Sequence, residues 1–92
     1  MDEQQTSKPQ RHPRSAARVY DGEAVVISPD QNRVRMLNSV GTRIWELADG
    51  TRTPVQIANA LTEEYEVPLA DAQAEVDAFL AELTEKGVIV WY

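Results

Sequence analysis

The stretch LNSVGTRIWELADG, residues 37–50, decides the fold because an extended pattern of residues changes into a helical one within it. After its first residues, apolar side chains recur at helical spacing, at Val40, Ile44 and Leu47. Gly50 ends the run, and Asn38 or Ser39 can cap its start, since either side chain can accept from the free amides of a first helical turn. The stretch predicts a helix over residues 39–49 that follows directly from a strand and leaves a groove beside it.

Three short apolar segments upstream of this helix predict strands. They are Val19-Tyr20, Ala24–Ile27 and Arg33–Leu37. Asp21-Gly22 is a tight-turn signal between the first two segments, and residues 29–32 form a second turn rich in residues that favour bends. Residues 17–38 are therefore expected to form a small antiparallel meander.

Two further helices are predicted downstream. Thr53 caps the second helix, with Pro54 at its first position. The third helix is expected from about residue 70 to residue 86, with an apolar stripe of Ala72, Val76, Phe79, Leu80 and Leu83. Residues 88–91 are a final apolar segment, either a short strand or a packed tail. The order predicts an α+β, winged-helix-like fold: a three-stranded antiparallel N-terminal sheet followed by a three-helix bundle.

Length and composition restrict the class of protein. Ninety-two residues make one domain, which we place at residues 17–92, after a disordered polar tail at residues 1–16. The absence of cysteine excludes disulfides and thiolate chemistry. No apolar run approaches the roughly 20 residues of a membrane-spanning helix. Because the N-terminus has no apolar signal core, we expect a cytoplasmic protein with no membrane partner.

The sequence carries no pattern of an enzyme. His12 is the only histidine, and it lies in the expected tail, where a general base or metal ligand would lack rigid partners. The chain has no phosphate loop, nucleotide fingerprint or nucleophile elbow. We therefore expect no catalytic residue, no cofactor and no metal.

The charge distribution disfavours nucleic acid. The net charge is −6, and residues 63–86 hold eight acidic residues against Lys86 alone. An acidic helical half repels phosphate backbones. Its plainest explanation is a solvated helix face.

The strand at residues 33–37 is the candidate site. A three-stranded meander has two edge strands, and an extended peptide can add to an edge through backbone hydrogen bonds. Arg33 and Arg35 flank its apolar positions and could pair with acids of such a peptide. They could equally discourage unwanted edge-to-edge pairing, and the residues alone leave both interpretations open.

The ordered pattern of residues from about Arg18 to Val90 resembles the PqqD family, also known as the RiPP recognition element. It comprises Asp21-Gly22, Leu37-Asn38, the segment Gly41–Leu47, Asp49-Gly50, Thr53, Val55, Ile57, Leu61, Tyr65, Val76, Phe79-Leu80, Leu83 and Gly87–Ile89. The resemblance implies a non-catalytic adaptor that binds the leader of a ribosomally made precursor peptide and presents it to a modifying enzyme. It leaves open whether pyrroloquinoline quinone biosynthesis is involved.

The resemblance also implies a site. In the family the leader pairs as an added strand on the third strand and packs against the third helix. In this sequence the peptide-binding residues would be Arg33, Val34, Arg35, Met36 and Leu37 on the strand, with Gln73, Asp77, Leu80 and Thr84 on the helix. The partner enzyme is commonly a radical S-adenosylmethionine protein, whose iron–sulfur clusters would belong to the partner.

Two alternatives remain at this point. A winged-helix DNA-binding protein would have the same order of elements, but its recognition helix should carry more Arg and Lys than Lys86. A structural or dimerisation subunit without a peptide ligand could self-associate through strand edges or the Trp91-Tyr92 end. We expect a monomer or a weak homodimer.

Overall fold

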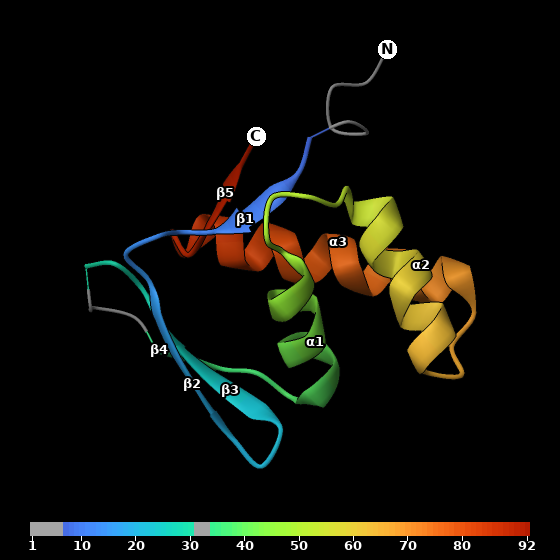
Figure 1. Cartoon of the computed structure of the whole chain (residues 1–92), viewed down its shortest axis with the longest axis horizontal. Coiled ribbons are helices and arrows are strands. Elements are labelled where there is room, and N and C mark those ends of the chain that lie inside the picture. Colours follow the sequence, from blue (N-terminus) through green and yellow to red (C-terminus); the bar gives the residue numbers. More distant parts are fainter. Residues whose placement is uncertain (1–6, 31–33) are drawn as a thin grey trace.

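The computed structural model describes residues 7–30 and 34–92. Five strands and three helices follow one another along the described chain (Figure 1): β1 Pro9–Arg11, β2 Ala16–Tyr20, β3 Glu23–Ile27, β4 Val34–Met36, α1 Ser39–Leu47, α2 Pro54–Glu64, α3 Leu69–Glu85 and β5 Ile89–Trp91. The fold is α+β with antiparallel pairing, as predicted. The expected single sheet is corrected to two, with strand orders β2-β3-β4 and β1-β5.

The second sheet, β1-β5, uses residues that we expected in an unstructured tail. Pro9 is buried and lies opposite Trp91, and the N–H of Lys8 donates to the carbonyl of Tyr92 at 2.8 Å. β1 also contacts the loop after α1, where the N–H of Gly50 donates to the carbonyl of Pro9 at 3.0 Å. Composition could not reveal this strand, because it is held by backbone hydrogen bonds to segments far along the chain rather than by its own side-chain pattern.

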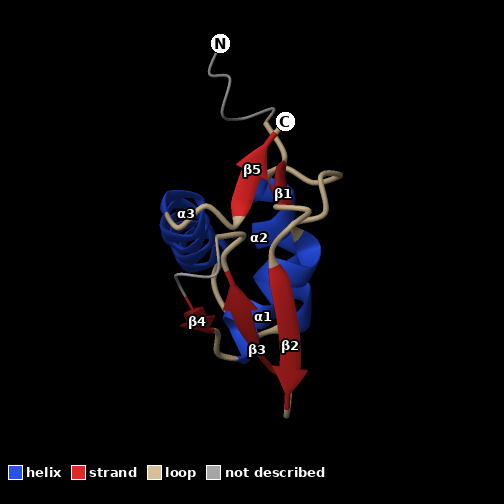
Figure 2. Ribbon diagram, turned by 90° about the vertical axis from the view of Figure 1, so that its left-hand side faces the viewer, coloured by secondary structure: helices blue, strands red, loops and turns tan. Residues whose placement is uncertain are grey.

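The hairpin between β2 and β3 is confirmed at the predicted turn. Asp21 and Gly22 have φ angles of 53° and 81°, and both values are positive, as a two-residue type I′ turn requires. Figure 2 shows the resulting sheet with β2 at one edge and β4 at the other, on the side of α3.

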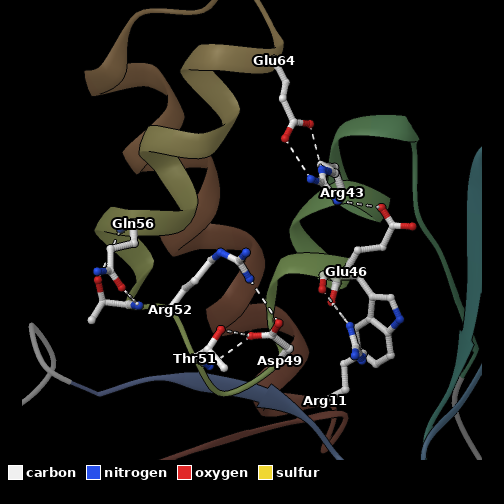
Figure 3. Close-up of polar contacts among 10 residues, drawn as sticks. Arg11, Arg43, Glu46, Asp49, Thr51, Arg52, Gln56 and Glu64 are labelled. Carbon is white, nitrogen blue, oxygen red and sulfur yellow. Dashed lines mark hydrogen bonds and ion pairs between the residues drawn. The ribbon is translucent and has the colours of Figure 1, made fainter.

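Side-chain caps begin the first two helices. Asn38, rather than Ser39, caps α1, and its Oδ1 accepts from the Gly41 N–H at 2.7 Å. Thr53 and Gln56 form a reciprocal capping box at the start of α2, with distances of 2.8 and 3.3 Å (Figure 3). Both helices therefore begin where local sequence placed them.

The core lies between the helices and the inner face of the β2-β3-β4 sheet. Its largest buried side chains are Ile44, Ile57, Leu61, Leu80, Leu83, Val26 and Val76. α2 packs along α3, whereas α1 contacts both α2 and β3. We therefore describe the helical part as an α2–α3 pair joined to the sheet by α1, in place of the predicted three-helix bundle.

Arg11 closes the C-terminal end of α1 (Figure 3). Its Nη1 donates to the carbonyls of Trp45 and Glu46 at 3.0 and 2.9 Å, and its guanidinium lies 6.0 Å from the centre of the Trp45 ring. The last carbonyls of a helix lack partners within the helix, so a cation there is favourable. This residue of the expected tail thus has a structural role.

Arg43 of α1 holds Glu64 of α2 by two parallel hydrogen bonds of 2.8 and 2.9 Å (Figure 3). The hydrogen bond from Arg43 holds the pKa of the Glu64 carboxyl below its usual value of 4.5. A lowered pKa in the folded state stabilises the protein above the unfolded pKa, and this stabilisation is lost as the pH falls through the folded pKa. We expect Glu64→Gln to lower the free energy of unfolding by about 0.5 kcal/mol at neutral pH and by almost nothing near pH 3, since the pair is partly exposed.

Urea denaturation at the two pH values measures this difference. Glu63→Gln is the matched control, because Glu63 is exposed on the same helix and makes no ion pair within the described residues. A Glu64 effect of equal size at both pH values would mean that packing, and not charge, joins α1 to α2.

Candidate peptide-binding groove

The free edge of β4 is the first component of the candidate site. The N–H of Leu37 donates to the carbonyl of Ala24 at 2.8 Å, and in an antiparallel ladder hydrogen-bonded pairs alternate with non-bonded pairs. The backbone groups of Arg35 therefore point toward β3, whereas those of Val34 and Met36 point away from it. Within the described residues no strand pairs with that outer edge.

The strand presents its side chains to different surroundings. Val34 and Met36 are 62% and 66% exposed, large values for apolar side chains beside an open edge. Leu37 is buried in the core, and Arg35 reaches α3. Arg33, the remaining strand residue that we expected in the site, lies outside the described residues.

A groove of about 370 Å³ separates β4 from α3. It lies where the sequence predicted one, beside the strand that leads into α1. Its lining residues come from β4, α1 and α3: Arg35, Met36, Leu37, Asn38, Gly41, Ile44, Glu75, Ala78, Phe79 and Glu82. An edge with unpaired backbone groups thus opens onto a space with an apolar floor.

One face of α3 forms the far wall of the groove. Glu75, Ala78, Phe79 and Glu82 follow the spacing of neighbours on a helix surface. Phe79 forms part of the apolar floor together with Ala78. Phe79 packs against the core, as its place in the apolar stripe predicted, and it also lines the groove. Both glutamates were predicted to be solvated helix positions, so this face of α3 was not predicted as part of the site. The sequence signal for this face was the helical spacing that places two glutamates on either side of Ala78 and Phe79.

The α3 residues that we predicted for the site do not line this groove. Leu80 is buried in the core, and the Thr84 hydroxyl accepts a 2.8 Å hydrogen bond from the Trp91 indole. Gln73 and Asp77 are also absent from the groove wall. At 3.6 residues per turn these four residues lie roughly half a turn from the observed face. The core stripe separates the two faces, and helical periodicity cannot tell on which side of that stripe a neighbouring strand packs.

An ion pair crosses the groove. Arg35 Nε of β4 donates to Glu82 Oε2 of α3, and Lys86 lies 3.9 Å from the same carboxyl oxygen. The hydrogen bond from Arg35 holds the pKa of the Glu82 carboxyl below its usual value. A second Arg35 nitrogen donates to the Met36 carbonyl. That carbonyl has two lone pairs, so it can still accept from another chain.

Gly41 lets α1 approach the groove wall closely. A Cβ atom at this position would lie 2.9 Å from Cε2 of Phe79 and 3.2 Å from Oδ1 of Asn38. Any larger side chain would push the Phe79 ring and reshape the apolar floor. Gly41, within residues 37–50, thus helps to shape the candidate site.

Neither a metal-binding cluster nor a membrane-spanning helix is found in the part of the chain that the structure describes. No three acidic or histidine side chains there converge to hold a metal ion. None of the helices is long and apolar enough to cross a bilayer, among the residues described. The groove offers hydrogen-bonding edges, an apolar floor and fixed charges, which suit an extended peptide.

A family model for coenzyme PQQ synthesis protein D, PqqD, matches residues 23–89. The chain belongs to the PqqD family. A comparison with curated proteins by sequence gave no match. The matched segment runs from β3 to β5 and so includes the whole groove.

Solved structures agree with this assignment to the PqqD family. TbiB1 in complex with the TbiA(beta) leader peptide is 25% identical, with a TM-score of 0.78 over 87% of this chain and 93% of that chain. The PqqD truncation of Methylobacterium extorquens PqqCD, described as a functional and stand-alone RiPP recognition element, is 26% identical, with a TM-score of 0.73 over 89% and 87%. Lasso peptide synthetase B1 complexed with the leader peptide shares the fold at 24% identity, with a TM-score of 0.78 over 90% and 98%.

Proposed function

We propose that this PqqD-family protein is a non-catalytic adaptor that binds the leader of a ribosomally synthesised precursor peptide and presents it to a modifying enzyme. The observation that carries the proposal is the open edge of β4 beside the groove to α3. The TbiB1 structure, which shares the fold over most of both chains, is a complex with a leader peptide.

In this proposal the leader extends the sheet as a fourth strand. The N–H and C=O groups of Val34 and Met36 pair with its backbone, and residues 34–37 form the described strand part of the site. Backbone pairing supplies affinity without regard to sequence, whereas pockets for alternate side chains supply specificity. Alternate side chains of the added strand would point into the groove and meet Ala78 and Phe79.

The α3 contacts in this proposal are those of the groove wall. Glu75, Ala78, Phe79 and Glu82 replace the face around Gln73, Asp77, Leu80 and Thr84 that sequence analysis suggested. In this proposal the ion pair between Arg35 and Glu82 stays closed when the peptide enters.

The family resemblance supports three finer parts of the proposal. The domain is winged-helix-like, and its unit extends the predicted residues 17–92 to include β1, which pairs with β5. The enzyme that receives the leader is a radical S-adenosylmethionine protein or another peptide-modifying enzyme. Because precursor peptides are made on ribosomes, the two would meet in the cytoplasm.

A nuclear magnetic resonance titration tests the function directly. The probe is a synthetic candidate leader, chosen from short reading frames near the gene, added to the isotope-labelled protein. We expect shifts of the backbone signals of residues 34–37 and of Glu75, Ala78, Phe79 and Glu82, because these groups border the added strand. Signals of α2, which lies away from the groove, serve as the internal control. If the groove signals stay unchanged at saturating peptide, the proposed function is wrong.

A further inference from the structure

Glu75 is the free carboxylate of the groove. It is exposed in the wall formed by α3, and no ion pair joins it to any described residue. Glu82, two turns further along α3, is already paired with Arg35. A peptide in the groove therefore meets one unpaired negative charge. This charge, Glu75, lies at the N-terminal end of the groove wall that α3 forms.

The apolar floor lies one turn from this charge. Glu75 and Phe79 are four residues apart, which is about 6 Å along a helix axis. Alternate side chains of an extended strand are about 6.6 Å apart and point to the same side. A strand that runs along α3 can thus place one side chain beside Glu75 and the next one on the same face above Phe79.

We infer that the peptide taken by this groove carries a lysine or arginine two positions from an apolar residue, and that Glu75 selects the basic side chain. The inference rests on the proposed function and names the chemistry of its ligand. It stands on three observations together: the open edge of β4, the apolar floor at Ala78 and Phe79, and a carboxylate beside them without a partner.

The overall charge of the protein supports this choice of ligand. The net charge is −6, so a basic peptide is attracted and an acidic peptide is repelled before contact. Arg35 does not offset Glu75, because its guanidinium is bound to Glu82 and to the Met36 carbonyl. Specificity of this kind also includes rejection, since an acidic residue placed beside Glu75 would be destabilising.

Selection from a display library of random 15-residue peptides tests the inference without knowledge of the natural leader. The selection is run on the wild-type protein, on Glu75→Lys and on Glu63→Lys. The last variant is the matched control, because it makes the same change of charge at an exposed position of α2 outside the groove. Chemical-shift mapping of the best peptide on each protein identifies binders that occupy the groove.

The wild-type protein is expected to enrich groove binders with Lys or Arg two positions from an apolar residue, and Glu63→Lys should enrich the same pattern. Peptides enriched on Glu75→Lys should carry Asp or Glu in place of the basic residue. This variant should bind the peptide selected on the wild-type protein about tenfold more weakly.

Two different failures are distinguishable. The inference is overturned if the peptides that bind the groove lack a basic residue, or if Glu75→Lys still enriches peptides with the same basic residue. Either result leaves the proposed function intact. If circular dichroism shows that all three proteins are folded and none enriches a peptide that maps to the groove, the proposed function fails and the inference fails with it.

Discussion

Replacing Met36 by proline is expected to weaken peptide binding at least tenfold while the domain stays folded. The N–H of Met36 points away from β3, so proline removes a donor only from the outer edge of β4. Each lost backbone hydrogen bond at a buried strand interface costs about 1–3 kcal/mol, and the proline ring also obstructs the incoming strand. Fluorescence polarisation with a labelled leader peptide measures the affinity, and circular dichroism checks the fold.

Val19→Pro is the matched control for this substitution. Val19 lies on β2, at the opposite edge of the same sheet. Because hydrogen-bonded and non-bonded pairs alternate along β2 and β3, the N–H of Val19 also points away from β3. Val19 is 56% exposed, so proline should be tolerated there to a similar degree. The control should bind the peptide normally. Loss of binding in Val19→Pro with normal binding in Met36→Pro would place the added strand on β2 and refute our assignment of the edge.

Leu80→Ala is expected to lower the free energy of unfolding by about 3 kcal/mol. Leu80 is 1% exposed, and truncation of a buried leucine loses its transfer free energy and leaves a cavity. A loss of this size is a large fraction of the stability of a small domain. Chemical denaturation measures it. Because Leu80 does not line the groove, the fraction that remains folded should bind the leader peptide with nearly unchanged affinity.

Leu69→Ala is the control for the Leu80 experiment. Leu69 begins the same helix and is 43% exposed, so the same change of side chain should cost less than about 1 kcal/mol. A Leu80→Ala protein of normal stability with impaired binding would return Leu80 to the binding face that sequence analysis suggested, and it would contradict the core position described above.

Features held by short-range interactions were predictable from the sequence. Asn38 and Thr53 start their helices by contacts with residues three positions away, and Asp21-Gly22 supplies the backbone angles of the hairpin turn. β4 was also predictable, because its alternating side chains and the helix cap that follows it are recognised from neighbouring residues along the chain. β1 was missed because its partners in β5 lie about 80 residues further along the chain.

The candidate site divides in the same way. The strand of the groove was predictable, because its own residues and their resemblance to a known family mark it. The wall contributed by α3 was not. The face around Gln73, Asp77 and Thr84 was chosen, and Glu75 and Glu82 were interpreted as solvated positions. Both faces flank the same buried stripe and both carry polar residues, so the sequence pattern does not separate them.

The sequence by itself determined the α+β class, the helix starts, the family and the strand that offers its edge, because each depends on neighbours along the chain or on the ordered pattern as a whole. Only the tertiary structure decided that the sheet is divided, that Arg11 closes α1, and that Glu75 and Phe79 face β4. The physical reason is that a helix can rotate about its axis or pack on either side without changing its local hydrogen bonds. Long-range packing alone selects which face becomes the wall of the groove.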